Sequence, residues 1–164
     1  MRILALDAST KSTGVALFED TNLLDYTCFT ASSADVITRI TKMIKKLILY
    51  IEKNPIDKVI LEEVRPETGT NLNTYRALMW LQAAIAFMLH EHFPRVKLEY
   101  VYPSEWRSAC GIKTGRGVHR QEQKEYDMKF VKETYGLDVN DDIADAIGIG
   151  HSQVNNLKDY YDWS

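Results

Sequence analysis

Apolar and polar positions along the chain follow two different spacings, and each spacing predicts one kind of element. Short apolar runs bounded by turn-forming residues predict five strands: residues 2–7, 14–20, 22–30, 58–64 and 97–103. Helical spacing predicts further elements: residues 33–53, a helix around Trp80, residues 104–110, residues 121–135 and a last helix from about residue 140. This order predicts an α/β fold, in which a five-stranded mixed sheet starts with three antiparallel strands and is flanked by helices.

Length and cysteine content narrow the class of protein. The 164 residues suit a single domain, 1–164, large enough to bury a core without a disulfide framework. Cys28 and Cys110 lie far apart and outside any C-x-x-C pattern, so we expect neither a disulfide nor a zinc site. The chain starts in a strand rather than in a signal peptide, and its longest apolar stretch, Ala77–Leu89, is shorter than the roughly 20 residues that a bilayer requires. We therefore expect a cytoplasmic protein without a membrane partner.

The charges are unevenly distributed along the sequence. The formal net charge is −3, which by itself argues against a nucleic-acid partner. Residues 106–120 nevertheless hold four basic side chains and no acidic one: Arg107, Lys113, Arg116 and Arg120. Such a segment is typical either of a local anion-binding surface or of a solvated loop, and composition does not decide between them.

Two of the predicted strands end in acidic residues. Asp7 follows a fully apolar run, where an uncompensated carboxylate would cost several kcal/mol. Glu62 and Glu63 end the strand that begins at residue 58. Because side chains alternate between the two faces of a strand, we expect only one of these glutamates to face Asp7, and periodicity does not select which.

The last helix also begins with acidic residues, in the segment DDIAD. Asp145 lies three or four positions after Asp142 and Asp141, so it shares a helix face with one of them. Asp141 is a good candidate for the N-cap, which would leave Asp142 and Asp145 as the pair on one face.

Four carboxylates brought together would repel one another and raise each other's pKa values unless divalent cations were present. Oxygen-only ligands suit Mg²⁺ or Mn²⁺, and two such ions about 4 Å apart hold the attacking and leaving oxygens of a phosphodiester. Each acidic residue alone is more typical of a turn, a strand end or a helix cap. Only their order and spacing together favour a metal site.

With these motifs in place, the sequence resembles the RuvC-type Holliday junction resolvases of the ribonuclease H-like superfamily, particularly the bacteriophage members. The resemblance rests on four segments in the family's order: ILALDASTKSTGVALFE, VILEEV, YVYPSEWR and DDIADAIGIGH. It implies a ribonuclease H-like fold and a structure-selective endonuclease that resolves four-way junctions by paired, metal-dependent cuts. For a phage protein it also implies the cytoplasm of the bacterial host.

The resemblance assigns roles to individual residues. It implies that Asp7, Glu62, Asp142 and Asp145 are the catalytic carboxylates and hold two Mg²⁺ ions, for which Mn²⁺ substitutes. It selects Glu62 because the family's acid is the first of the pair, and it leaves open whether Glu63 or Asp141 assists. It also implies a homodimer that packs through the helix around Trp80, which is apolar on almost every side.

We expect the DNA backbone to contact a set of basic residues: Arg65, Arg107, Lys113, Arg116, Arg120 and Lys124. The loop after Glu62 departs from the family pattern, because cellular members carry an aromatic residue there that stacks at the junction centre. The segment EEVRPETGTN has none, and Arg65 is the candidate to replace it. This departure predicts looser junction preference and cleavage of other branched DNA.

Three alternatives remain at this stage. DASTKSTGVALFE also resembles the phosphate loop of sugar kinases and actin-like ATPases, but those proteins need two lobes and 164 residues supply one. A general nuclease acting on flaps and forks would use the same carboxylates. A non-catalytic binder of branched DNA would gain nothing from acidic residues placed beside phosphates.

Overall fold

The structure is a computed structural model that describes residues 1–66 and 69–161, with side chains to residue 154. Its strands are β1 (Arg2–Asp7), β2 (Ser12–Glu19), β3 (Asn22–Thr30), β4 (Lys58–Glu62) and β5 (Lys97–Val101). Its helices are α1 (Val36–Lys53), α2 (Leu72–His92), α3 (Pro103–Ala109), α4 (Arg120–Tyr135) and α5 (Asp141–Tyr161). The order of elements agrees with the order predicted from the sequence.

The strands form one mixed sheet in the order β3-β2-β1-β4-β5. β1 is antiparallel to β2 and parallel to β4, and β3 and β5 are the two outermost strands. The end of β1, the start of β2 and the ends of β3 and β4 therefore meet at one edge of the sheet, which we call the carboxylate edge. This confirms the predicted five-stranded mixed sheet with three antiparallel strands first.

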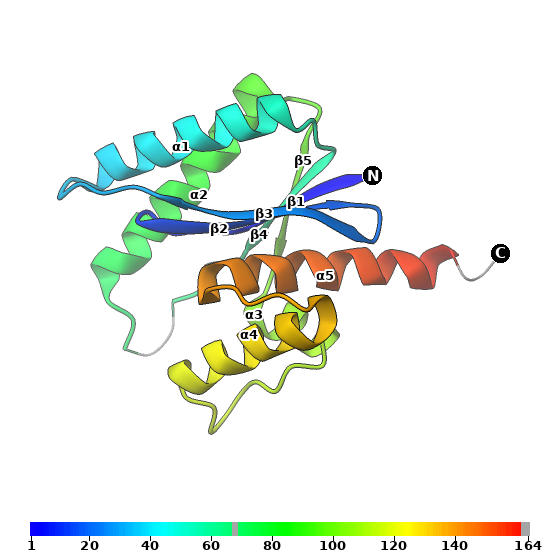
Figure 1. The fold of residues 1–164 in the computed structure, drawn as a ribbon. Helices are drawn as coiled ribbons and strands as arrows, with labels where there is room; N and C mark the ends of the chain where they lie inside the picture. The colour runs from blue at the N-terminus through cyan, green and yellow to red at the C-terminus, as the bar shows by residue number, and fades with distance from the viewer. Residues whose placement is uncertain (67–68, 162–164) are drawn as a thin grey trace.

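Helices cover both faces of the sheet (Figure 1). On one face, α1 and α2 pack on alternate strand residues such as Leu4 and Leu6. On the other, α5 lies directly on β1 and β2, and α3 and α4 pack against α5. Ile3 and Ala5 belong to this second core, so each strand contributes its two faces to two separate hydrophobic layers.

Several boundaries differ from the prediction for local reasons. α1 begins at Val36 rather than residue 33, because the Asp35 side chain accepts a hydrogen bond from the Thr38 backbone N–H at 2.8 Å and caps the helix. β5 ends at Val101, because Pro103 opens α3. The last backbone hydrogen bond from β4 to β5 runs from the Glu63 N–H to the Val101 carbonyl at 2.8 Å, so β4 ends at Glu62 rather than at residue 64. None of the described helices is long and apolar enough to cross a membrane.

Candidate active site

The ends of β1 and β4 bring Asp7 and Glu62 together. These parallel strands are paired residue by residue up to the position before each acid. Ala5 and Ile60, two residues earlier on each strand, are buried in the core under α5, so Asp7 and Glu62 share that face of the sheet. The alternation of β4 thereby directs Glu62, and not Glu63, toward Asp7.

The first turn of α5 approaches the same edge because β2 carries a glycine there. Gly14 pairs with Asp7 in the sheet, and a Cβ at Gly14 would lie 1.9 Å from the backbone oxygen of Asp142. Ser12 donates a hydrogen bond from its hydroxyl to the Asp142 carboxylate at 2.6 Å. The absence of a side chain at Gly14 allows this close approach, and the hydrogen bond from Ser12 holds Asp142 against β2.

The cap of α5 is Asn140 and not Asp141. The Asn140 side-chain oxygen accepts a hydrogen bond from the backbone N–H of Ile143 at 2.9 Å. Asp141 lies in the first turn instead, where its carboxylate pairs with Lys124 of α4 at 2.6 Å and its pKa is lowered by that contact. Of the three acids at the start of α5, Asp142 and Asp145 remain as the pair on the side of the sheet.

The acids at this edge interact electrostatically. Burial raises the pKa of Asp7 well above its usual value, and the nearby charges of Glu62 and Asp142 raise it further. Burial likewise raises the pKa of Asp145 to about 10, with added repulsion from Asp7 and Asp127. The structure therefore places Glu62, Asp142 and Asp145 each within interaction range of Asp7 at the carboxylate edge.

Arg107 lies inside this cluster rather than on the surface. Its guanidinium donates to both carboxylate oxygens of Asp127 on α4, at 2.8 and 3.1 Å, and lies 3.6 Å from Asp145. Its side chain is 12% exposed and that of Asp127 is 1% exposed. The sequence groups Arg107 with the exposed DNA contacts, whereas here it partly neutralises the acids of the site.

The residues at this edge fit a divalent cation, although no group of three or more potential metal ligands is preassembled among the described side chains. Trp106 donates from Nε1 to Glu62 at 2.7 Å, and Ser12 donates to Asp142, so each acid has its own partner. Asp145 Oδ1 differs, because it is buried without a hydrogen-bond partner among the described residues. A buried carboxylate oxygen left unpaired beside other carboxylates is a ligand that a hard cation such as Mg²⁺ would satisfy.

The remaining predicted DNA contacts lie in two parts of the chain, around the start of α4 and in the loop after β4. Lys113, Arg116 and Arg120 are exposed in and just after the loop between α3 and α4. Lys124 joins α4 to the start of α5 through its ion pair with Asp141, so this loop belongs to the same end of the molecule as the acids.

Arg65 follows Glu62 in the loop after β4. It is exposed, and its guanidinium stacks over the Tyr102 ring at 3.3 Å from the centroid. Residues 67 and 68 of the same loop lie outside the described residues.

Three residues that hold the acids or Arg107 in place were not predicted from the sequence: Ser12, Trp106 and Asp127. Asp127 carried a usable signal, because it lies four positions before the buried Val131 and thus on the apolar face of α4. A carboxylate on such a face needs a cationic partner. Ser12 and Trp106 gave no local signal, since their partners lie 130 and 44 positions away.

The comparisons with known proteins identify the fold. No protein-family model matches the sequence, and no curated protein sequence matches it significantly. Thermus thermophilus RuvC in complex with a Holliday junction substrate superimposes with a TM-score of 0.74 at 15% identity, over 96% of each chain. A second T. thermophilus RuvC structure gives a TM-score of 0.74 at 14% identity, over 98% of this chain and 97% of that chain. The yeast mitochondrial Holliday junction resolvase Ydc2 gives 0.61 at 15% identity, over 98% and 82%.

The chain thus has the ribonuclease H-like fold of RuvC over nearly its whole length. This confirms the fold that the resemblance predicts.

Proposed function

We propose that this chain is a structure-selective endonuclease that resolves Holliday junctions, and also cuts other branched DNA, by metal-dependent hydrolysis of phosphodiesters. Residues 1–164 would form one nuclease domain. The observation that carries the proposal is the gathering of Asp7, Glu62, Asp142 and Asp145 at one edge of a sheet with the RuvC fold. A kinase-like function is disfavoured because this chain superimposes on nearly all of a RuvC chain.

In this proposal the four carboxylates hold the divalent cations, with Mg²⁺ as the expected ion. The bound ions supply positive charge at the attacking and leaving oxygens of the phosphodiester. The chain's own residues fix the acids in place: Trp106 orients Glu62, and Ser12 orients Asp142. Arg107, held by the buried Asp127, limits the repulsion around Asp145 while the site is empty of substrate.

The DNA backbone would contact the exposed basic residues at the same end of the molecule. Lys113, Arg116 and Arg120 present charge without a described acidic partner, and Lys124 lies between this loop and α5. Arg65, whose guanidinium lies over the Tyr102 ring in the loop after β4, would contact the unpaired bases or the backbone at a branch point. Arg107 is left out of this surface because its guanidinium is already engaged.

A panel of DNA substrates tests the function. Four-way junction, three-way junction, flap and linear duplex are incubated separately with the protein and Mg²⁺. We expect paired nicks in the four-way junction and no cutting of linear duplex. Equal cutting of all branched forms would favour a general debranching nuclease, which the absence of an aromatic residue from the described part of the loop after β4 supports. Tight junction binding without any cleavage would identify a non-catalytic binder.

The pKa shifts predict how stability depends on pH without metal. Asp7 and Asp145 have higher pKa values in the folded than in the unfolded protein, so the folded state binds more protons. Their contribution is present below about pH 4 and is lost as pH rises toward about 10, so the free energy of unfolding falls over this range. Millimolar Mg²⁺ should restore stability by mass action and should raise the Tm more at about pH 9 than at about pH 5. Calorimetry with EDTA or Mg²⁺ measures both effects, and equal Mg²⁺ shifts at the two pH values would contradict the metal assignment.

A homodimer is part of the proposal, with α2 as the interface. One side of α2 is buried on the sheet, while apolar side chains on another side are exposed: Leu72 by 80%, Met79 by 38%, Trp80 by 43% and Phe87 by 72%. An apolar stripe of this kind along one helix is typical of an interaction surface. A second copy packed on it would give two active sites related by a two-fold axis, as paired cuts require.

The double substitution Trp80→Glu/Phe87→Glu tests this interface. It should weaken dimerisation at least about 100-fold, because each buried aromatic side chain contributes roughly 1.5–3 kcal/mol. Sedimentation equilibrium measures the dissociation constant. Leu49→Glu is the matched control, because Leu49 is an apolar side chain 57% exposed on α1, and it should leave the dimer intact. A double variant that stays dimeric would place the interface elsewhere.

A further inference from the structure

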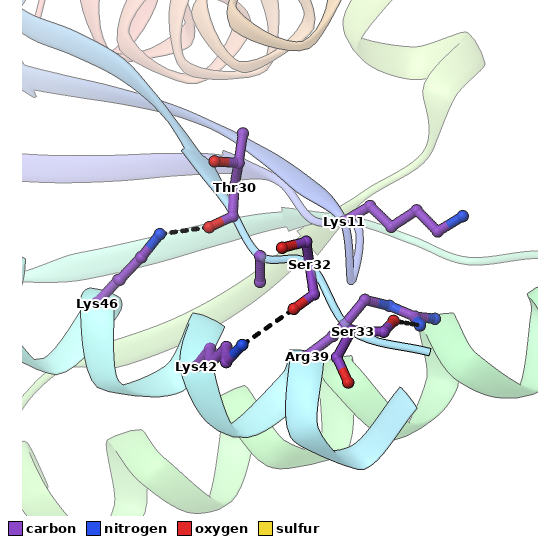
Figure 2. A pocket seen from close by; sticks show the side chains of 8 residues that line it. Lys11, Thr30, Ser32, Ser33, Arg39, Lys42 and Lys46 are labelled. Atoms are coloured by element: carbon purple, nitrogen blue, oxygen red, sulfur yellow. Dashed lines mark hydrogen bonds between the residues drawn. The ribbon is translucent and has the colours of Figure 1, made fainter. Parts of the chain in front are cut away.

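A cationic cavity lies on the α1 face of the sheet, opposite the face that carries the carboxylates. Its volume is about 700 Å³, and it opens between the first turns of α1 and residues 30–33 (Figure 2). Four basic side chains line it: Lys11, Arg39, Lys42 and Lys46. No acidic side chain is among the described residues of its wall. We call it the α1 pocket.

Backbone carbonyls hold Lys42, Lys46 and Arg39 in place. Lys42 donates from Nζ to the Ser32 carbonyl at 2.9 Å, and Lys46 donates to the Thr30 carbonyl. An ammonium group has three N–H donors, so each lysine keeps donors for a further acceptor. Figure 2 shows these two lysines on one side of residues 30–33 and Lys11 on the other. The charges are thus positioned before any ligand arrives.

Arg39 makes the strongest case for an anionic ligand. It is only 9% exposed, and it donates to the Ser33 carbonyl at 2.6 Å and to the Thr10 hydroxyl at 3.2 Å. No described carboxylate lies within ion-pair distance of Arg39 or of the three lysines. The Asp35 carboxylate, one helical turn before Arg39, interacts with it electrostatically without forming an ion pair. A guanidinium withdrawn from water is therefore only partly compensated, and an anion entering the pocket would complete the compensation.

The α1 pocket lies at the carboxylate edge of the sheet. Ser12, the first residue of β2, pairs with Thr30, the last residue of β3, and it also holds Asp142 by a hydrogen bond. Lys11 directly precedes Ser12, and its carbonyl accepts a hydrogen bond from Ala31 at 3.0 Å. One short segment therefore contacts both the acids on one face and the pocket on the other.

We propose that the α1 pocket binds a backbone phosphate of the DNA strand that runs from the active site around this edge of the sheet. The proposal rests on the nuclease function and adds a second contact surface, separate from the loop between α3 and α4. The wall supplies ammonium, guanidinium and hydroxyl groups and, among the described residues, no aromatic ring on which a base would stack. This chemistry matches the phosphodiester backbone better than a free nucleotide.

The double substitution Lys42→Gln/Lys46→Gln tests the pocket, because glutamine keeps a donor for the backbone carbonyl while the charge is lost. Lys45→Gln/Lys53→Gln is the matched control, with the same charge change at exposed positions of the same helix outside the pocket. Binding of a four-way junction is measured at several salt concentrations in an Asp7→Asn background, so that cleavage does not interfere.

We expect the pocket variant to bind the junction about 10-fold more weakly and to reduce the magnitude of the slope of log K against log salt by about 1, as the loss of one phosphate contact predicts. The control should change the slope by less than half as much, and both variants should keep the parent Tm within a few degrees. Equal slopes in the pocket and control variants would overturn the proposal.

Two further readouts separate the possible outcomes. Junction cleavage by the protein with Asp7 intact tests the proposed function. If this protein cuts the junction while the pocket and control variants have equal salt slopes, the pocket proposal is rejected and the proposed function stands. Inorganic phosphate is titrated in a thermal-shift assay as the second probe. A phosphate-dependent rise in Tm that is lost in the pocket variant, together with an unchanged DNA slope, would identify a free-anion site and overturn the DNA assignment.

Discussion

Asp7→Asn should abolish junction cleavage and at the same time make the metal-free protein more stable. Asparagine keeps the size of the side chain but removes a charge that burial, Glu62 and Asp142 all disfavour. Removing one such charge should raise the free energy of unfolding by roughly 1–3 kcal/mol without metal. The same change removes a central metal ligand, so the rate should fall at least about 10³-fold, which is about 4 kcal/mol in the activation barrier.

The opposite signs of the two effects make this prediction specific. Urea unfolding with EDTA measures the stability, and single-turnover cleavage of a four-way junction in Mg²⁺ measures the rate. Asp138→Asn is the control, because it makes the same chemical change on a side chain that is 86% exposed and pairs with Lys132. It should leave cleavage unchanged and alter stability by less than about 0.5 kcal/mol. Cleavage by Asp7→Asn at near the parent rate would refute the proposed site.

Much of the fold follows from local patterns in the sequence. The alternation in β1 and β2 and the helical spacing in α1 each depend on residues close together in the chain, so the element order was predictable. The boundaries depend on single contacts, such as the Asp35 cap of α1, or on a neighbouring strand, as at the end of β4. These features become visible only once the elements are assembled.

The acids of the site were predictable as a set, but their surroundings were not. Asp7 and Glu62 were identifiable because each is a carboxylate at the end of an apolar strand. Periodicity did not decide between Glu62 and Glu63; the family resemblance selected Glu62, and the register of β1 against β4 explains why it shares a face with Asp7. Arg107 appeared to be one of several basic residues near an exposed loop, because its partner Asp127 lies 20 positions further along the chain. Long-range pairs of this kind decide whether a cation faces DNA or the interior.

The packing of α5 on β2 shows how the fold positions the site. Gly14, Gly148 and Gly150 lie at the contacts between α5 and its neighbours, where an added Cβ would meet Asp142, Trp106 and Phe18 respectively. Small residues let the helix lie close to the sheet, and this closeness sets the position of the acids on its first turn.

Gly14→Ala should therefore disable the site through the backbone, without changing any of its side chains. The added Cβ would lie 1.9 Å from the Asp142 backbone oxygen and 3.1 Å from the Ile143 nitrogen, so the first turn of α5 must move away from β2. A displacement of about 1 Å at a catalytic group costs about 100-fold in rate, and we expect a loss of at least that size. The overpacking should also lower the free energy of unfolding by roughly 1–3 kcal/mol.

Gly150→Ala separates the loss of geometry from the loss of stability. Its Cβ would lie 2.2 Å from the Phe18 ring, on the same helix and strand but more than two turns from Asp142. It should destabilise the protein by a similar amount, while cleavage per folded molecule stays within a few-fold of the parent because the acids keep their places. Single-turnover cleavage, corrected for the folded fraction by circular dichroism, measures both variants. The prediction depends on the close approach of α5 to β2, which brings Asp142 near Asp7. If Gly14→Ala cut junctions as fast as Gly150→Ala, the contact between Gly14 and Asp142 would not control the site.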